Sequence, residues 1–98
     1  MTSKPENQNQ LKIQVRPEIA EGKYSNTAMI GHTPSDFIAD FLFAAPGMPQ
    51  MTVVSRIIMT PENAKKLLMA LGDNIAKYEA QFGQIELHNT NIGPIGNN

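Results

Sequence analysis

Residues 51–68 read M-T-V-V-S-R-I-I-M-T-P-E-N-A-K-K-L-L, and the character of the sequence changes at the centre of this stretch. Its first part, Met51–Met59, is rich in β-branched residues on both faces, which predicts a strand. Thr60 then supplies a hydroxyl at the N-cap, Pro61 suits the first helical position, and Glu62 places a carboxylate at the positive end of the helix dipole. The stretch therefore predicts a strand that passes directly into a helix.

The predicted helix covers Pro61–Phe82 and has one apolar side. Its apolar residues recur at the spacing of a single helical face, and they are Ala64, Leu67, Leu68, Leu71, Ile75, Tyr78 and Phe82. Gly83 is expected to end the helix. Gly72 lies inside it, where glycine costs about 1 kcal/mol relative to alanine and indicates either a bend or the close approach of another backbone. A helix of this kind is expected to cover one face of a sheet.

Three further strands are predicted upstream of this stretch. Leu11–Arg16 alternates apolar and polar residues, Tyr24–His32 is rich in strand formers, and Phe37–Ala44 is apolar on both faces. Thr33–Asp36 (T-P-S-D) has the chemistry of a turn and predicts a hairpin, and Gln84–His88 indicates a short extended segment after the helix. The predicted fold is α+β, a four-stranded antiparallel meander sheet followed by one long C-terminal helix packed on one face.

The composition is that of one small domain. Ninety-eight residues, of which 41% are hydrophobic and 17% charged, are too few for two separate cores. Residues 11–88 form the expected α+β domain, and the polar segments 1–10 and 89–98 have the composition of disordered tails.

Charge and cysteine content exclude several classes of protein. A net charge of -1 gives no positive field for a general nucleic-acid binder, and the absence of cysteine rules out disulfides, thiolate catalysis and cysteine-ligated metals. No apolar run reaches the roughly 18 residues of a membrane span, and the first residues do not resemble a signal peptide. We therefore expect a cytoplasmic protein with no membrane and no nucleic-acid partner.

The predicted sheet has more apolar surface than one helix can cover. A register that pairs Asp40 with Arg56 places Phe37, Phe41, Phe43, Val53, Ile57 and Met59 on one face, and Ile38, Leu42, Val54 and Ile58 on the other. Leaving four aliphatic side chains in water would forfeit several kcal/mol, at roughly 25 cal/mol per Å². We therefore predict that Ile38, Leu42, Val54 and Ile58 form an oligomer interface, and that the chain's partner is itself, as a dimer or a dimer of dimers.

Asp40 and Arg56 are the strongest polar pair in the sequence. A carboxylate among apolar residues is costly unless it is paired, so a structural ion pair that fixes the register or an oligomer interface is expected. The alternative is a polar anchor in a binding groove. Methionines at a loop and on the sheet likewise suit either a packed interface or an adaptable binding surface.

No catalytic, metal or cofactor site is predicted. His32, Asp36 and Asp40 match no known ligand spacing, and neither His32 nor His88 has a nearby partner. Ser25, Ser35 and Ser55 lack a histidine–acid constellation, and the glycines form no phosphate-binding loop. The chain is therefore not expected to be an enzyme, unless oligomerisation brings His32, Asp36, Asp40 and Arg56 together from different copies.

Several motifs resemble a known family. They are G-K-Y-S-N-T-A-M-I at residues 22–30, S-D-F-I-A-D-F at 35–41, P-G at 46–47, S-R-I-I-M-T-P-E-N-A-K-K-L-L at 55–68, and D-N-I-A-K-Y-E at 73–79 followed by F-G at 82–83. Over residues 11–86 the chain is similar to the small bacterial family of domain of unknown function 3467, which implies no activity that could be transferred.

The order of elements also resembles that of the export chaperone SecB. The SecB subunits form a dimer of dimers and bind unfolded polypeptide along apolar grooves, and this likeness concerns the fold alone. The sequence thus favours a small cytoplasmic homo-oligomeric binding module without catalysis. The alternative is a SecB-like holdase for non-native or secreted polypeptides.

Overall fold

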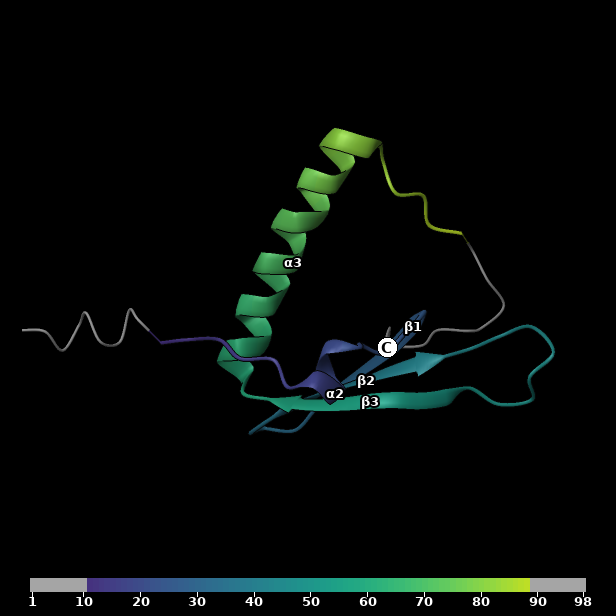
Figure 1. Ribbon diagram of the computed structural model, residues 1–98, viewed down its shortest axis with the longest axis horizontal. Coiled ribbons are helices and arrows are strands. Elements are labelled where there is room, and N and C mark those ends of the chain that lie inside the picture. The colour runs from purple at the N-terminus through teal and green to yellow at the C-terminus, as the bar shows by residue number, and fades with distance from the viewer. Residues whose placement is uncertain (1–10, 89–98) are drawn as a thin grey trace, which may run out of the picture.

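The computed structural model describes residues 11–88 of the chain, so the two predicted tails, residues 1–10 and 89–98, lie outside the described residues. The elements are α2 (Pro17–Ala20), β1 (Thr27–His32), β2 (Phe37–Phe43), β3 (Thr52–Met59) and α3 (Pro61–Phe82). The class is α+β, with an antiparallel sheet and a long C-terminal helix (Figure 1). Within the described residues the sheet has three strands in the order β1-β2-β3, not the four that were predicted.

The first hairpin forms where the T-P-S-D turn predicted it. The hydroxyl of Thr33 accepts hydrogen bonds from the backbone N–H groups of Ser35 and Asp36, both at 3.1 Å. The N–H of Thr33 also donates to the carbonyl of Asp36 at 2.9 Å. At the far end of the hairpin the Asn26 side chain continues the ladder, because its amide donates to the Ala44 carbonyl at 2.7 Å and its oxygen accepts from the Ala44 N–H at 3.0 Å.

The pairing of β2 with β3 confirms the predicted partnership of Asp40 and Arg56. The register then shifts between Phe41 and Leu42, because Phe41 lies opposite Ser55 while Leu42 lies opposite Val53. Val54 is therefore the extra residue of a β-bulge. The predicted faces are wrong at this point, since Val53 joins the side of Leu42 and Val54 joins the side of Phe41.

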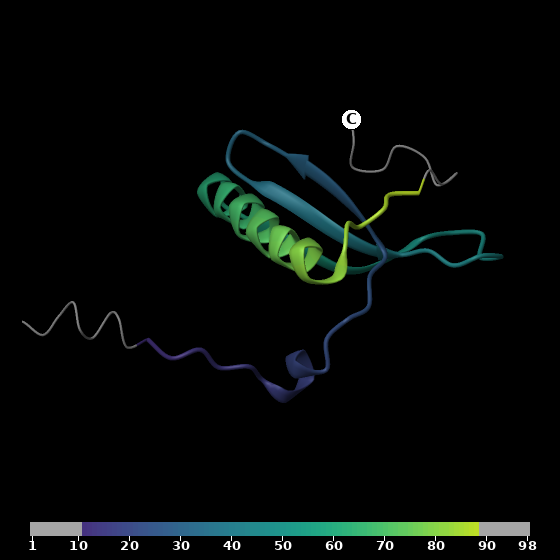
Figure 2. The same ribbon diagram turned by 90° about the horizontal axis from the view of Figure 1, so that it is seen from above.

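Leu11–Arg16 is not the predicted fourth strand. Within the described chain it has no ladder partner, and its apolar side chains are exposed, Ile13 by 93%. Figure 2 shows the segment before α2 running clear of the sheet. Alternation determines which side of a strand is apolar, but a strand also needs the edge of another strand to pair with. The turn at α2 directs this segment away from the edges of the sheet. Gln84–His88 is likewise no strand, although the Ile85 N–H donates to the Glu79 carboxylate at 2.9 Å.

Helix α3 begins and ends at the predicted residues. The hydroxyl of Thr60 accepts a hydrogen bond from the Asn63 N–H at 3.1 Å, and Pro61 occupies the first turn. Gly83 has a positive φ of 104°, which ends the helix, and its N–H donates a last helical hydrogen bond to the Glu79 carbonyl at 3.0 Å. The helix is continuous through Gly72, where an added Cβ would meet no atom within 4 Å.

Helix α3 does not pack on the sheet of its own chain, contrary to the prediction. It rises away from the end of β3, and none of its residues is buried (Figure 1). A single residue, Thr60, connects the two elements, with φ -70° and ψ 155°. The residue before a proline favours such extended geometry, and in this conformation the helix leaves the end of β3 at an angle to the sheet.

The protomer consequently has a very small core. Among residues 11–88 only two hydrophobic side chains, Ala39 and Leu42, are buried, and both belong to β2. Asp40 lies between them and is also buried. A buried core residue ordinarily touches neighbours on every side, so a core confined to one strand leaves most apolar side chains of the protomer in contact with water.

Candidate interaction surfaces

The sheet presents two faces of different chemistry, which follow from the observed register. The side chains of directly opposed residues lie on the same side of a sheet. The first, here the ion-pair face, carries Met29, Ile38, Asp40, Leu42, Val53, Arg56 and Ile58. The second, here the phenylalanine face, carries Ala28, Ile30, His32, Phe37, Ala39, Phe41, Ser55, Ile57 and Met59, with Val54 added by the bulge.

Asp40 and Arg56 form a two-pronged ion pair at the centre of the ion-pair face. The Nε of Arg56 lies 2.6 Å from Oδ1 of Asp40, and its Nη2 lies 2.8 Å from Oδ2. The hydrogen bonds and charge of Arg56 hold the pKa of Asp40 below its ordinary value, although burial acts in the opposite direction. The same contacts raise the pKa of Arg56. The pair therefore stays ionised and fixes the position of β3 against β2.

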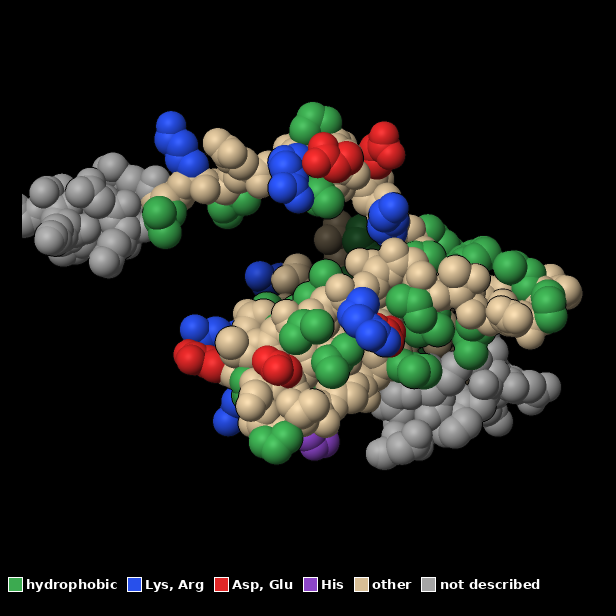
Figure 3. Space-filling view, turned by 90° about the horizontal axis from the view of Figure 1, so that it is seen from below, with side chains coloured by type: hydrophobic (Ala, Val, Ile, Leu, Met, Phe, Trp, Pro, Cys, Tyr) green, Lys and Arg blue, Asp and Glu red, His purple; other side chains and the backbone are tan. Residues whose placement is uncertain are grey.

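Apolar side chains that remain open to water surround this pair. Ile58 is 61% exposed, Val53 46% and Met29 42%. Figure 3 shows hydrophobic side chains gathered on the underside of the molecule, with an acidic and a basic side chain in contact among them. The result is a patch with an apolar rim and a neutral charged centre, which is suited to a protein partner.

The four residues of the predicted interface have different positions in the structure. Ile58 is exposed and Ile38 is half-buried on the ion-pair face, while Leu42 on that face is already buried within the protomer. Val54 lies on the opposite face. Met29 and Val53 occupy the ion-pair face instead. Val53 was expected on the other face, because the bulge that reverses the alternation of β3 could not be foreseen. For Met29, no face was predicted from the sequence.

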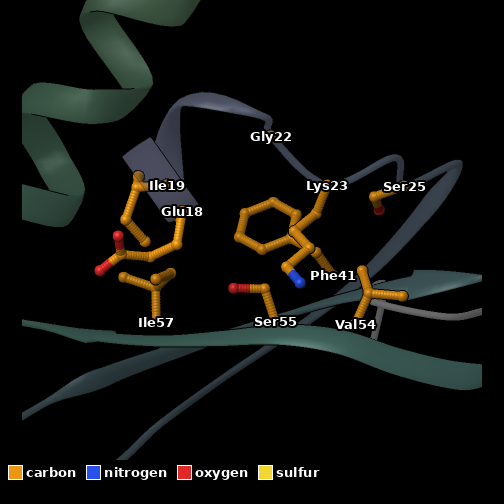
Figure 4. Close-up of a pocket in the computed structure, with 9 residues that line it drawn as sticks. All are labelled: Glu18, Ile19, Gly22, Lys23, Ser25, Phe41, Val54, Ser55 and Ile57. Atoms are coloured by element: carbon orange, nitrogen blue, oxygen red, sulfur yellow. The ribbon is translucent and has the colours of Figure 1, made fainter. Parts of the chain in front are cut away.

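The phenylalanine face contains a hollow of about 400 Å³ beneath α2. Its floor is formed by sheet residues and its roof by the segment around α2; the lining residues are Glu18, Ile19, Gly22, Lys23, Ser25, Phe41, Val54, Ser55 and Ile57 (Figure 4). Ile19 lies above Ile57, and Glu18 and Lys23 add one charge of each sign at the roof. The hollow suits an apolar group. This hollow could not be predicted from the sequence, because nothing in residues 18–23 indicates which strand they overlie.

The residues considered for a shared catalytic or metal site lie apart in the protomer. His32 belongs to the phenylalanine face, where its ring stacks on Phe37 with 5.5 Å between centroids, whereas Asp40 lies on the opposite face. Asp36 belongs to the turn between β1 and β2. Within residues 11–88 there is no group of three or more histidine and acidic side chains arranged to hold a metal ion.

None of the helices that the structure describes within residues 11–88 is both long enough and apolar enough to cross a membrane.

Comparison with known protein families identifies the chain. The family model described as "Protein of unknown function (DUF3467)" matches residues 1–87. The chain belongs to this family. The match spans the whole sheet and the whole of α3, and it confirms the resemblance seen in the DUF3467 motifs. No curated protein and no solved structure matches the chain, so the likeness to SecB is not confirmed.

Proposed function

We propose that this DUF3467 protein is a small cytoplasmic binding module that associates with copies of itself through the ion-pair face, and that it works by binding rather than by catalysis. The observation that supports this is the small core. Only Ala39 and Leu42 are buried hydrophobic residues within the described chain, while Ile58, Val53 and Met29 remain open on one face. A sheet that leaves one face so apolar requires a cover.

A second copy fits the ion-pair face better than a charged partner does. The Asp40–Arg56 pair is neutral as a unit, so the face has no excess charge for a ligand to match. The Arg56 side chain is still 61% exposed, and its guanidinium uses two of its five N–H donors on Asp40. A twofold axis through this face would oppose apolar rim to apolar rim and bring the two neutral ion pairs close together.

The mass of the full chain in solution tests this proposal. Light scattering at micromolar concentration is expected to give at least twice the 10.8 kDa of one chain. The variant Ile58→Asp is expected to reduce that mass, because it places a carboxylate of each copy on the apolar rim of the proposed contact. A full chain that is strictly monomeric would contradict the proposal.

A second candidate function, a holdase for non-native polypeptide, is favoured by the loop between β2 and β3. Met48 and Met51 on this loop are exposed by 47% and 37%, and flexible methionines suit the binding of varied apolar segments. In this case stoichiometric protein would suppress the aggregation of an unfolded client, and the double substitution Met48→Ser with Met51→Ser would abolish that effect. Unchanged client aggregation in the presence of the full chain would eliminate this candidate.

A further inference from the structure

Besides the ion-pair face, the protomer has two further exposed apolar surfaces. One is the apolar stripe of α3, on which Leu68, Leu71 and Phe82 are exposed by 70%, 54% and 66%. The other is the phenylalanine face, on which Ile30 is 52% exposed and Ile57 46%. An amphipathic helix and the apolar face of a sheet are a stable pair of layers, so each surface has the chemistry that the other requires.

We propose that α3 of one copy packs on the phenylalanine face of a second copy, and that the second copy returns the same contact. This inference rests on the self-association proposed above and adds a second contact to it. Together the two contacts predict a dimer of dimers.

The junction at Thr60 explains why the helix covers a partner's sheet and not its own. Thr60 alone links β3 to α3, and the following Pro61 holds it in an extended conformation with ψ 155°. Its hydroxyl also caps the helix through the Asn63 N–H, so a rotation about this residue would break the cap. The helix is therefore held at an angle to its own sheet (Figure 1).

The dimensions of the two surfaces agree. The stripe from Ala64 to Phe82 is about 27 Å long at 1.5 Å per residue. The eight residues of β3 extend over about 26 Å at roughly 3.3 Å per residue. A helix laid along the strands would thus match the sheet in length, beside the segment around α2 that already overlies part of this face.

The area available is that of a stable interface. Six stripe side chains are at least 40% exposed, namely Leu67, Leu68, Leu71, Ile75, Tyr78 and Phe82. Their exposed parts total about 600 Å², if a fully exposed large side chain contributes roughly 180 Å². Two such helices, with the equal area of sheet that they cover, would bury about 2,400 Å², which exceeds the roughly 1,600 Å² of a standard interface. This reciprocal packing of α3 on the other copy's sheet, here the exchange, also covers both surfaces, whereas a helix from another protein on the sheet would leave α3 uncovered.

Introduced cysteines test the exchange, because the chain has no cysteine of its own. A chain that carries both Ile75→Cys and Ile30→Cys is expected to form a covalent dimer under mild oxidation. The matched control combines Ile30→Cys with Met69→Cys, whose side chain is exposed on the side of α3 opposite the stripe, and it is expected to stay uncross-linked. The pair Ile75→Cys with Ile57→Cys repeats the test on β3, because Ile30 and Ile57 both lie opposite Ala39 and so at the same level of the sheet.

The products on a non-reducing gel decide between the alternatives. An intramolecular disulfide in a monomeric band would show that α3 covers its own sheet, and it would overturn the inference. Equal cross-linking of the control, or none in either test pair while light scattering still shows an oligomer, would overturn the exchange and leave the ion-pair contact standing. A monomeric full chain would overturn both.

Two aspartate substitutions on α3 give a second readout. Leu71 lies in the stripe, and Met69 lies two residues away, about 200° around the helix. Leu71→Asp is expected to halve the mass of the assembly, while Met69→Asp is expected to leave it unchanged. An unchanged mass in Leu71→Asp, with the helical content retained, would contradict the exchange.

Discussion

Replacing Ile58 by alanine should weaken self-association in a way that the structure allows to be calculated. The side chain is 61% exposed in the protomer. Full burial of an isoleucine is worth about 1.5–3 kcal/mol, so covering the exposed part contributes about 0.9–1.8 kcal/mol per copy. A twofold contact contains this side chain twice, and the loss is about 2–3.5 kcal/mol for the pair. At 1.4 kcal/mol per tenfold, the dissociation constant should rise roughly 30- to 300-fold.

Sedimentation velocity over a dilution series measures this change, because it gives the dissociation constant of each assembly step. Ile13→Ala is the matched control, since Ile13 is more exposed than Ile58 but lies outside the sheet. This control should associate as the unsubstituted chain does. The reasoning would be refuted if Ile58→Ala associated as tightly as the unsubstituted chain, or if Ile13→Ala weakened association by the same factor.

Three further predictions concern the stability of the protomer. Thr60→Ala should lower the free energy of unfolding in urea by about 1 kcal/mol, while Thr60→Ser should retain it, because the cap needs only the hydroxyl; equal losses in both would argue against the cap. Gly72→Ala should raise the same free energy by about 0.5–1 kcal/mol, since the added Cβ meets no atom of the protomer; a decrease would show that another chain packs there. The contribution of Asp40 should be complete above the ordinary carboxyl pKa of 3.8 and be lost as the pH falls below it, because folding lowers this pKa. Urea unfolding at a series of acidic pH values should show a smaller loss in Asp40→Asn, and identical pH profiles would contradict the assignment.

Local chemistry made several features predictable from the sequence. The start of α3 at Pro61 followed from one hydroxyl and one proline, and its end followed from Gly83. The turn at Thr33–Asp36 and the pairing of Asp40 with Arg56 followed from turn chemistry and from the cost of an unpaired carboxylate. Each of these features depends on groups that lie close together once the hairpins form.

The features that the sequence did not predict depend on longer-range geometry. The bulge at Val54 lies in T-V-V-S, where adjacent valines suit either face and leave the alternation undetermined. The alternation of Leu11–Arg16 specified an apolar side without specifying an edge to pair with. The direction of α3 depends on the one-residue junction at Thr60, and the hydrophobic pattern of the sequence does not predict that direction. The ion pair at the centre of the ion-pair face could be predicted from the sequence, whereas the hollow beneath α2 could not.

The concentration dependence of unfolding tests most directly whether the chain hides its apolar surface only by associating with further copies. If folding is coupled to self-association, the folded state gains stability by mass action as the protein concentration rises. Unfolding in urea at concentrations that span two decades should then shift the midpoint upward with concentration, by the equivalent of about 1.4 kcal/mol per tenfold for a dimer. A cooperative transition with the same midpoint at every concentration would show a protomer that is stable by itself, and it would contradict the claim.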